Sequence, residues 1–232
     1  MDQNAPTRST STGKQAAHEH GLLFLLDGNN IAYRAFYALP DTIATSTGFP
    51  TNALYGFCSM VIKILSEYRP ESVIVAWDSP GKTFRHEEFV EYKAHRKPMP
   101  DLLREQWQYF EELCEAFGFV NLKIPGFEAD DILATLARQA DAERRETVIV
   151  TGDRDALQLV SDDVTVMSTG RGITEVKLYD PEGVRERFGI PPRLIPDMIG
   201  LKGDTSDNIP GIPGIGEKTA ATLLQQFGSV EE

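Results

Sequence analysis

Short apolar runs alternate with longer amphipathic stretches along most of the chain. The apolar runs have strand length and are LLFLL at 22–26, VIVAW at 73–77, TVIVT at 147–151 and VTVMS at 164–168. Runs that are apolar at successive positions predict strands covered on both faces, as in a parallel sheet. We therefore expect four strands in the middle of the molecule.

The stretches between these runs carry apolar residues at helical spacing. They predict helices over 52–66, 101–117 and 128–140, with Asp101 as the N-cap of the second helix and Gly118 just past its end. Strands and helices that alternate in this way predict an α/β fold with a mostly parallel sheet flanked by helices.

The pattern changes towards the end of the chain. Asp180-Pro181 is typical of a helix start and Gly189 of a helix end. A stretch dense in Gly and Pro at 203–220 then leads into a helix that ends near Gly228.

These changes predict three segments. Residues 1–20 are rich in Ser, Thr and Gln without apolar periodicity, which predicts a disordered tail. We expect an α/β core over 21–179 and a second region over 180–232.

Acidic residues follow the predicted strands where each strand ends. Asp27 follows the first strand, Asp78 the second, and Asp153 and Asp155 the third. The carboxyl ends of parallel strands share one edge, where open α/β sheets bind ligands. Further acidic residues start the third predicted helix or lie in the GDTSDN turn: Glu128, Asp130, Asp131, Asp204 and Asp207. Taken singly, these could instead stabilise a helix N-terminus or a turn.

Seven carboxylates at one sheet edge, with two more nearby, would need positive charge. Two carboxylates about 4 Å apart repel by about 4 kcal/mol at an effective dielectric constant of about 20. Oxygen ligands without His or Cys suit hard divalent cations such as Mg²⁺ or Mn²⁺. The set exceeds what one ion needs, so the sequence predicts two ions, an arrangement that serves in-line cleavage of phosphodiesters.

A basic segment follows the second predicted strand, beside Asp78. Residues 79–104 carry six basic side chains against four acidic ones, and the basic ones are Lys82, Arg85, Lys93, Arg96, Lys97 and Arg104. In isolation such a run is typical of a solvated helix face. Beside a metal cluster it predicts a cover for an anionic substrate, with Tyr92 stacking on a base.

A glycine-rich turn in the second region predicts a contact with DNA backbone. In GIPGIGEKTA at 211–220, Gly214 and Gly216 precede a helix that carries Lys218 and Thr219 in its first turn. Glycines let backbone N–H groups approach a phosphate at a helix N-terminus. The pattern indicates a helix-hairpin-helix, and the alternative is an ordinary Gly/Pro turn before a helix.

The net charge changes meaning once these residues are set apart. The 232 residues hold 23 Lys and Arg against 35 Asp and Glu, which gives a net charge of −12 and by itself argues against a nucleic-acid partner. Without the nine candidate ligands, 26 acidic residues remain against 23 basic ones. Much of the acidity is therefore local to the predicted metal site.

Several features indicate a cytosolic protein. No apolar run approaches the roughly 20 residues of a membrane span, and the first 20 residues lack the apolar core of a signal peptide. Cys58 and Cys114 lie in apolar helical patterns, which predicts buried free thiols in a reducing compartment.

Six motifs occur in a fixed order along the chain: LLDGNNIAYRAFYALP, FRHEEFVEYKAHR, GFEADDILATLA, TGDRDALQLV, GDTSDNIPGIPGIGEKTA and FGS. In these motifs the chain resembles, over about residues 22–230, the 5′-nuclease (5′-3′ exonuclease) domains of bacterial DNA polymerase I, within the flap endonuclease family. The resemblance implies a PIN-like core with a helical arch over about 79–104, followed by a helix-3-turn-helix region.

The resemblance also implies roles for individual residues. The first-metal ligands of the family match Asp27, Asp78, Glu128 and Asp130. Its second-metal ligands, some of which act through water, match Asp131, Asp153, Asp155, Asp204 and Asp207. Catalytic positions of the arch match Lys93, Arg85, Arg96 and Tyr92, and DNA-binding positions fall on Lys82, Lys97, Gly214, Gly216, Lys218 and Thr219.

The implied activity is that of a structure-specific 5′-3′ exonuclease and 5′-flap endonuclease. A metal-bound water or hydroxide would attack the phosphodiester and leave a 5′-phosphate and a 3′-hydroxyl, with two Mg²⁺ or Mn²⁺ ions. The hairpin would bind a monovalent cation such as K⁺. The implied setting is primer removal in replication and DNA repair in the bacterial cytoplasm or nucleoid, by a monomer that cleaves DNA flaps, including RNA-primed ones.

The family normally continues past FGS with more helices and often a polymerase. We therefore expect no polymerase activity from this chain, and a weaker grip on duplex DNA.

Two other functions stay open on the residues alone. A PIN-type ribonuclease shares the strand-end acids, and a non-catalytic binder of DNA junctions would use the hairpin with a structural metal. A phosphatase of the haloacid dehalogenase type is disfavoured, because that chemistry needs Asp-x-Asp after the first strand and Leu25 occupies the first of these positions.

Overall fold

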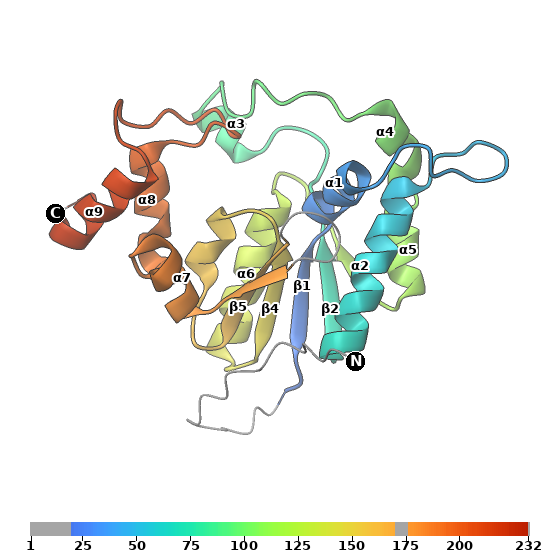
Figure 1. Ribbon diagram of the computed structural model, residues 1–232, viewed down its shortest axis with the longest axis horizontal. Coiled ribbons are helices and arrows are strands. Elements are labelled where there is room, and N and C mark those ends of the chain that lie inside the picture. Colours follow the sequence, from blue (N-terminus) through green and yellow to red (C-terminus); the bar gives the residue numbers. More distant parts are fainter. Residues whose placement is uncertain (1–19, 170–175, 232) are drawn as a thin grey trace, which may run out of the picture.

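The computed structural model describes residues 20–169 and 176–231. The predicted tail lies outside the described residues except for its last residue, His20. One six-stranded sheet forms the centre, with helices on both faces (Figure 1). In spatial order its strands are β3 (Val120–Leu122), β2 (Ser72–Ala76), β1 (Leu23–Asp27), β4 (Thr147–Thr151), β5 (Val164–Thr169) and β6 (Val176–Tyr179).

The predicted mostly parallel sheet is confirmed. Strands β1, β2, β4 and β5 match the four apolar runs to within a residue. Every pairing among the first five strands is parallel. The sequence did not predict the edge strands β3 and β6. These strands are short and partly solvated, with Val120 55% exposed, so neither has the continuous apolar run that marks a central strand.

The register brings the strand ends level. Leu26 at the end of β1 pairs with Val75 in β2 and Val150 in β4. Asp27 is therefore level with the end of β2, and Asp78 and Asp153 each lie two residues beyond their own strands. The expected edge of strand-end carboxylates is thus built by the pairing of the three central strands.

The four strands β1, β2, β4 and β5 each contribute to two cores, because successive side chains point to opposite faces. Leu23 and Leu25 pack on one face, and Phe24 and Leu26 pack on the other. The Phe24 face is covered by α1 (Gly28–Ala38), α2 (Asn52–Tyr68), α4 (Asp101–Trp107) and α5 (Phe110–Ala116). The opposite face is covered by α6 (Ala129–Ala142), α7 (Pro181–Phe188), α8 (Ile195–Lys202), α9 (Glu217–Phe227) and the 3₁₀ helices η1 (Asp155–Leu159) and η2 (Pro192–Leu194).

The helix predicted over 101–117 is two helices in the structure. Between α4 and α5 the backbone N–H of Tyr109 donates to the carbonyl of Gln106, three residues back, and this tighter turn separates the helices. The predicted N-cap is also wrong: Pro100 precedes the helix, and Asp101 lies in its first turn, where it pairs with Arg104.

Local signals in the second region are confirmed. Asp180 caps α7 by accepting from the backbone N–H of Gly183, and Gly189 ends that helix with φ of +76°. Gly228 likewise follows the last residue of α9.

The segment 79–100, here named the strap, crosses the carboxyl ends of the strands between β2 and α4 (Figure 1). The expected helical arch is only partly helical: α3 (Phe84–Glu88) spans five residues, and the rest consists of turns and extended chain. Lys93 has φ of +56°, and Pro98 and Pro100 disfavour a helix in the residues before them. These residues explain why the strap is not a continuous helix.

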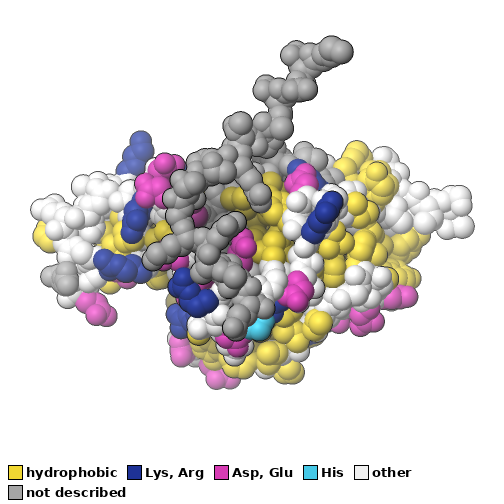
Figure 2. Space-filling model, turned by 90° about the horizontal axis from the view of Figure 1, so that it is seen from below, with side chains coloured by type: hydrophobic (Ala, Val, Ile, Leu, Met, Phe, Trp, Pro, Cys, Tyr) yellow, Lys and Arg dark blue, Asp and Glu magenta, His cyan; other side chains and the backbone are white. Residues whose placement is uncertain are grey.

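The opposite end of the molecule, where the strands begin, is seen in Figure 2. On the part of that face that the grey atoms leave visible, Lys and Arg side chains lie among Asp and Glu side chains. In the described ranges, no helix is long and apolar enough to cross a membrane.

Candidate metal centre

Asp27 is the most firmly held of the strand-end carboxylates. It is 5% exposed and caps α1, with Oδ1 accepting from the backbone N–H of Asn30 at 2.9 Å. Its Oδ2 accepts from the Thr151 hydroxyl at 2.8 Å. Both oxygens are thus oriented by neighbours on β4 and α1.

Asp78 joins the end of β2 to the start of α6. Its Oδ1 accepts from the backbone N–H of Ala129 at 2.8 Å. Glu128 and Asp131 form a reciprocal capping box at the same helix start, with Glu128 7% exposed. Helix capping, the alternative raised for these acids, is therefore real for both residues and coexists with their place at the sheet edge.

Asp130 lies in the first turn of α6, and the remaining acids lie in or beside two loops. Asp153 Oδ1 accepts from the backbone N–H of Asp155 at 2.9 Å, in the turn between β4 and η1. Asp204 Oδ1 accepts from the backbone and hydroxyl of Ser206, so the turn role proposed for this residue is also real. Asp207 faces the strap, and its Oδ2 accepts from the Tyr92 hydroxyl at 3.1 Å.

The acids form two electrostatic groups. Burial first, and then the charges of Asp27, Asp153 and Asp78, raise the pKa of Asp130 to about 8. Burial and the charges of Asp153, Asp204 and Asp207 raise the pKa of Asp155 to about 7. Asp153 is common to both groups.

The same effect reaches the end of β1. Burial raises the pKa of Asp27 to about 6, although hydrogen bonds from Asn30 and Thr151 favour its charged form. Lys93 lowers the pKa of Asp130 and Lys202 lowers that of Asp155, but burial and the neighbouring carboxylates outweigh both. The cluster as it stands therefore has a deficit of positive charge.

The strap supplies part of that charge. Arg85 makes a bidentate pair with Asp131, with N–O distances of 2.9 and 2.7 Å. Lys93 Nζ lies 2.9 Å from Glu128 Oε2, and Arg96 Nη2 lies 3.1 Å from Asp207 Oδ1. Three predicted arch cations thus contact three predicted metal ligands.

Among the described residues, no three acidic, histidine or cysteine side chains converge tightly enough to enclose an ion as they stand. The strap cations occupy Glu128, Asp131 and Asp207, which explains part of this spread. The donor set nevertheless fits hard divalent cations, because it consists of partly buried carboxylate oxygens whose negative charge the strap balances only in part.

Tyr92 differs from the expectation of an exposed stacking ring. It is 6% exposed, packs against His86 at a centroid distance of 5.2 Å, and its hydroxyl donates to Glu128 at 2.9 Å. In this structure Tyr92 supports the carboxylate cluster and presents no face to a base.

A cleft of about 1010 Å³ opens between the strap and α1. Its lining joins acids of the cluster to basic side chains of the strap and of two other elements: Asp27, Asp78, Asp130, Asp153, Lys93, Arg96, Lys97, Arg34 and Arg154. Arg34 and Arg154 were not predicted as site residues, and neither were Asn29 and Asn30, which also line the cleft. The signal for the asparagines was available, because they directly follow the strand-end motif Asp27-Gly28.

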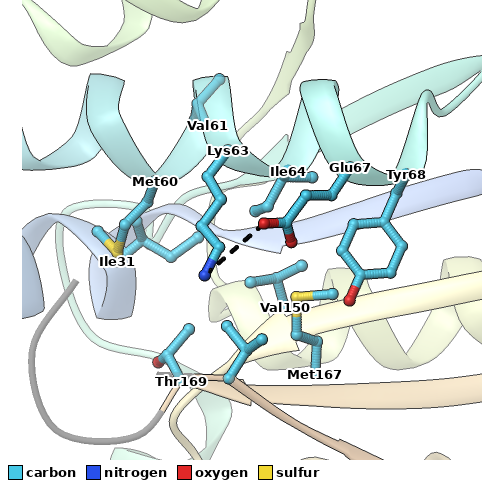
Figure 3. Close-up of a pocket in the computed structure, with 11 residues that line it drawn as sticks. Ile31, Met60, Val61, Lys63, Ile64, Glu67, Tyr68, Val150, Met167 and Thr169 are labelled. Carbon is cyan, nitrogen blue, oxygen red and sulfur yellow. Dashed lines mark ion pairs between the residues drawn. The ribbon is translucent and has the colours of Figure 1, made fainter. Parts of the chain in front are cut away.

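A second pocket lies away from this edge, between α2 and the sheet (Figure 3). It holds only about 20 Å³ and is lined mainly by apolar side chains such as Met60, Ile64 and Met167. Lys63 and Glu67, which pair at 3.9 Å, are the charged residues of its lining. Its size and apolar character separate it from the chemistry of the strand ends.

The glycine-rich turn lies at the start of α9. Gly214 has φ of +84°, and Gly216 is the N-cap of the helix without a side-chain cap. Lys218 and Thr219 are exposed. Lys82, in the strap, is also exposed and does not line the cleft. The turn therefore presents backbone N–H groups and a cation on the surface.

Comparison with known proteins agrees with this geometry. The family model for the 5′-3′ exonuclease N-terminal resolvase-like domain matches residues 22–189, and that for the 5′-3′ exonuclease C-terminal SAM fold matches residues 190–232. DNA polymerase I of Mycobacterium tuberculosis (strain H37Rv) is 50% identical over 209 residues, which cover 90% of this chain and 23% of the relative. For DNA polymerase I of Bacillus caldotenax the values are 50%, 90% and 24%. The chain spans about a quarter of the length of these relatives.

Solved structures share the fold at lower identity. T5 5′-exonuclease with bound zinc superposes with a TM-score of 0.71 at 24% identity, covering 90% of this chain and 77% of that one. The catalytic core of Rad2 with a DNA substrate gives a TM-score of 0.58 at 19% identity, with 90% and 62% covered. Since a single family model covers most of its length, the chain belongs to the 5′-3′ exonuclease family.

Proposed function

We propose that the chain is a divalent-metal-dependent, structure-specific 5′ nuclease that hydrolyses phosphodiester bonds of DNA. The observation that carries this proposal is the group of acidic residues near the carboxyl ends of the strands. There the charges of Asp27, Asp78 and Asp153 act on Asp130, and strap cations contact three further acids, Glu128, Asp131 and Asp207. Membership of the 5′-3′ exonuclease family and the names of its relatives support the same activity.

Two divalent cations, Mg²⁺ or Mn²⁺, would bind among the carboxylates. The group around Asp130, with Asp27, Asp78 and Glu128, would hold one ion. The group around Asp155, with Asp131, Asp153, Asp204 and Asp207, would hold the other, in part through water. Bound ions of this kind lower the pKa of water and stabilise charge that develops on a phosphate.

The strap residues would act on the substrate phosphate. Lys93 pairs with Glu128 in the metal-free chain. Bound divalent cations would balance the charge of Glu128 instead, and the ammonium group of Lys93 would then be free to bind a phosphate oxygen. Arg85 and Arg96 pair with acids of the same cluster and are equally placed to exchange a carboxylate for a phosphate. Lys97 in the cleft and the exposed Lys82 would contact the DNA strand near the cleaved phosphate.

The second region would hold the duplex. The N-terminus of α9, with Gly214, Gly216, Lys218 and Thr219, presents backbone N–H groups suited to phosphates, and K⁺ could bind at the turn. We assign the core to 21–179 and this DNA-binding region to 180–232. The proposed substrates are 5′ flaps, including RNA-primed ones, and the proposed roles are primer removal in replication and DNA repair in the bacterial cytoplasm, by a monomer.

The direct test is cleavage of a labelled 5′-flap DNA by this chain with Mg²⁺ and with EDTA. We expect cleavage only with Mg²⁺, and loss of turnover but retained flap binding in Asp153→Asn. Asp162→Asn is the matched control, because Asp162 is an exposed acid just before β5, at the opposite sheet edge. Flap binding without cleavage in Mg²⁺ would favour the junction binder, and faster cleavage of a matched RNA flap would favour the ribonuclease.

A further inference from the structure

Three strand ends of the candidate metal centre are tied together by two neutral side chains. Asn29 and Asn30 lie in the first turn of α1, directly after Asp27 and Gly28. The Oδ1 atom of Asn29 accepts from the backbone N–H of Asp78 at 3.0 Å. The Oδ1 atom of Asn30 accepts from the backbone N–H of Gly152 at 2.8 Å. One ends on the loop after β2 and the other on the loop after β4.

The tied loops are the ones that carry carboxylates. Asn29 reaches the backbone of Asp78 itself, and Asn30 reaches the residue before Asp153. Thr151 completes the set, because its hydroxyl donates to Asp27 Oδ2 and accepts from the backbone N–H of Asp153 at 3.0 Å. Hydrogen bonds therefore hold both loops to the residues at the end of β1 and the start of α1.

The close packing leaves little freedom around these ties. A Cβ atom on Gly152 would lie 2.9 Å from Asn30 Oδ1, so the loop and the amide are already in contact. A Cβ atom on Gly28 would lie 2.6 Å from carbons of the Trp77 ring, which is 1% exposed. The turn after β1 thus fits against the residue that precedes Asp78.

We propose that Asn29 and Asn30 are positioning residues of the metal centre, which hold the loops of Asp78 and Asp153 at a fixed separation from Asp27. The physical need is repulsion between the carboxylates, which would drive three untethered loops apart in the absence of cations. Neutral amides serve this purpose because they accept the backbone hydrogen bonds without adding negative charge. This inference rests on the proposed function, since it concerns the same metal centre.

The test is Mn²⁺ binding to the complete 232-residue chain, followed through the electron paramagnetic resonance signal of free Mn²⁺ without DNA. Asn30→Leu keeps the approximate size and removes the acceptor, and we expect about 10- to 100-fold weaker Mn²⁺ binding. Asn30→Asp restores an acceptor oxygen, and we expect affinity at least equal to that of the unchanged chain. Asn29→Leu tests the second tie in the same way if Asn30→Leu fails to fold.

Gln225→Leu is the matched control. Gln225 Nε2 donates to the carbonyl of Gly189 at 2.7 Å, so this variant also loses one hydrogen bond from a side-chain amide to a glycine of another segment, and neither residue is a candidate ligand. It should leave Mn²⁺ affinity unchanged. Affinity of Asn30→Leu within twofold of the unchanged chain would overturn the positioning role alone, whereas absence of Mn²⁺ binding by the unchanged chain would overturn the metal centre itself.

Discussion

Removal of the Lys93 ammonium group should destabilise the metal-free protein far more than the Mg²⁺-bound protein. Lys93 Nζ lies 2.9 Å from Glu128 Oε2 and 3.8 Å from Asp207 Oδ2, and the Lys93 and Glu128 side chains are 11% and 10% exposed. At an effective dielectric constant of about 20, these attractions amount to about 5.7 and about 4.4 kcal/mol before the dehydration of Lys93 is subtracted.

The net loss is smaller than these attractions. Removing one partner of a buried ion pair costs about 3–5 kcal/mol. Glu128 would keep the Tyr92 hydroxyl at 2.9 Å and Arg85 at 3.8 Å, so we expect the lower end of this range for Lys93→Met, about 3 kcal/mol. For a chain of this length that corresponds to a fall in Tm of about 6–12 °C.

Urea denaturation in EDTA and in saturating Mg²⁺ measures this prediction. Divalent cations would replace the lost charge beside Glu128, so Mg²⁺ should recover most of the free energy of unfolding of Lys93→Met. Lys93→Arg, which keeps the charge, should lose much less in EDTA. An equal loss for Lys93→Met in both media would refute the reasoning, because it would show that Lys93 stabilises the fold independently of the carboxylate charge.

Three further outcomes follow from other parts of the molecule. In EDTA the free energy of unfolding should rise as the pH falls, because burial and neighbouring charges raise the pKa of Asp130 from 3.8 to about 8. The folded chain then holds a proton that the unfolded chain releases, so this stabilisation is complete below pH 3.8 and is lost as the pH rises through about 8. Urea midpoints that decrease when the pH is lowered from about 8 to about 6 would contradict it. Gly28→Ala should cost about 1–3 kcal/mol in urea denaturation, because the new methyl group overlaps the immobile Trp77 ring; an unchanged midpoint would show that the turn can yield. Lys218→Ala should weaken duplex binding about equally for all sequences and reduce the salt dependence of log K by about one unit, as measured by fluorescence anisotropy; an unchanged salt slope would remove Lys218 from the interface.

The sheet edge could be predicted from sequence because its signals are local. An apolar run followed by an aspartate, directly or after one glycine, identifies both a strand and the direction in which its carboxylate lies, and this held for Asp27, Asp78 and Asp153. The caps at Asp180 and Gly189 were equally local.

The orientation of the strap could not be predicted in this way. Tyr92 is buried because Asp207, 115 residues later, accepts its hydroxyl and the Asp207 carbonyl accepts from the backbone N–H of Lys93. No pattern within 79–104 contains that information. The edge strands β3 and β6 could not be predicted for a similar reason. Pairing with β2 and β5 defines these strands, and their own apolar content does not.

The order of the strands has a consequence for the time at which the proposed metal centre can form during synthesis. β1 lies between β2 and β4, so its second neighbour is synthesised more than 100 residues after it. The carboxylates extend further, from Asp27 to Asp207. A nascent chain that ends before the 203–209 loop lacks the last two acids and the main-chain partner of Lys93. Because such distant contacts form late in folding, the proposed metal centre should assemble only after the 203–209 loop has left the ribosome.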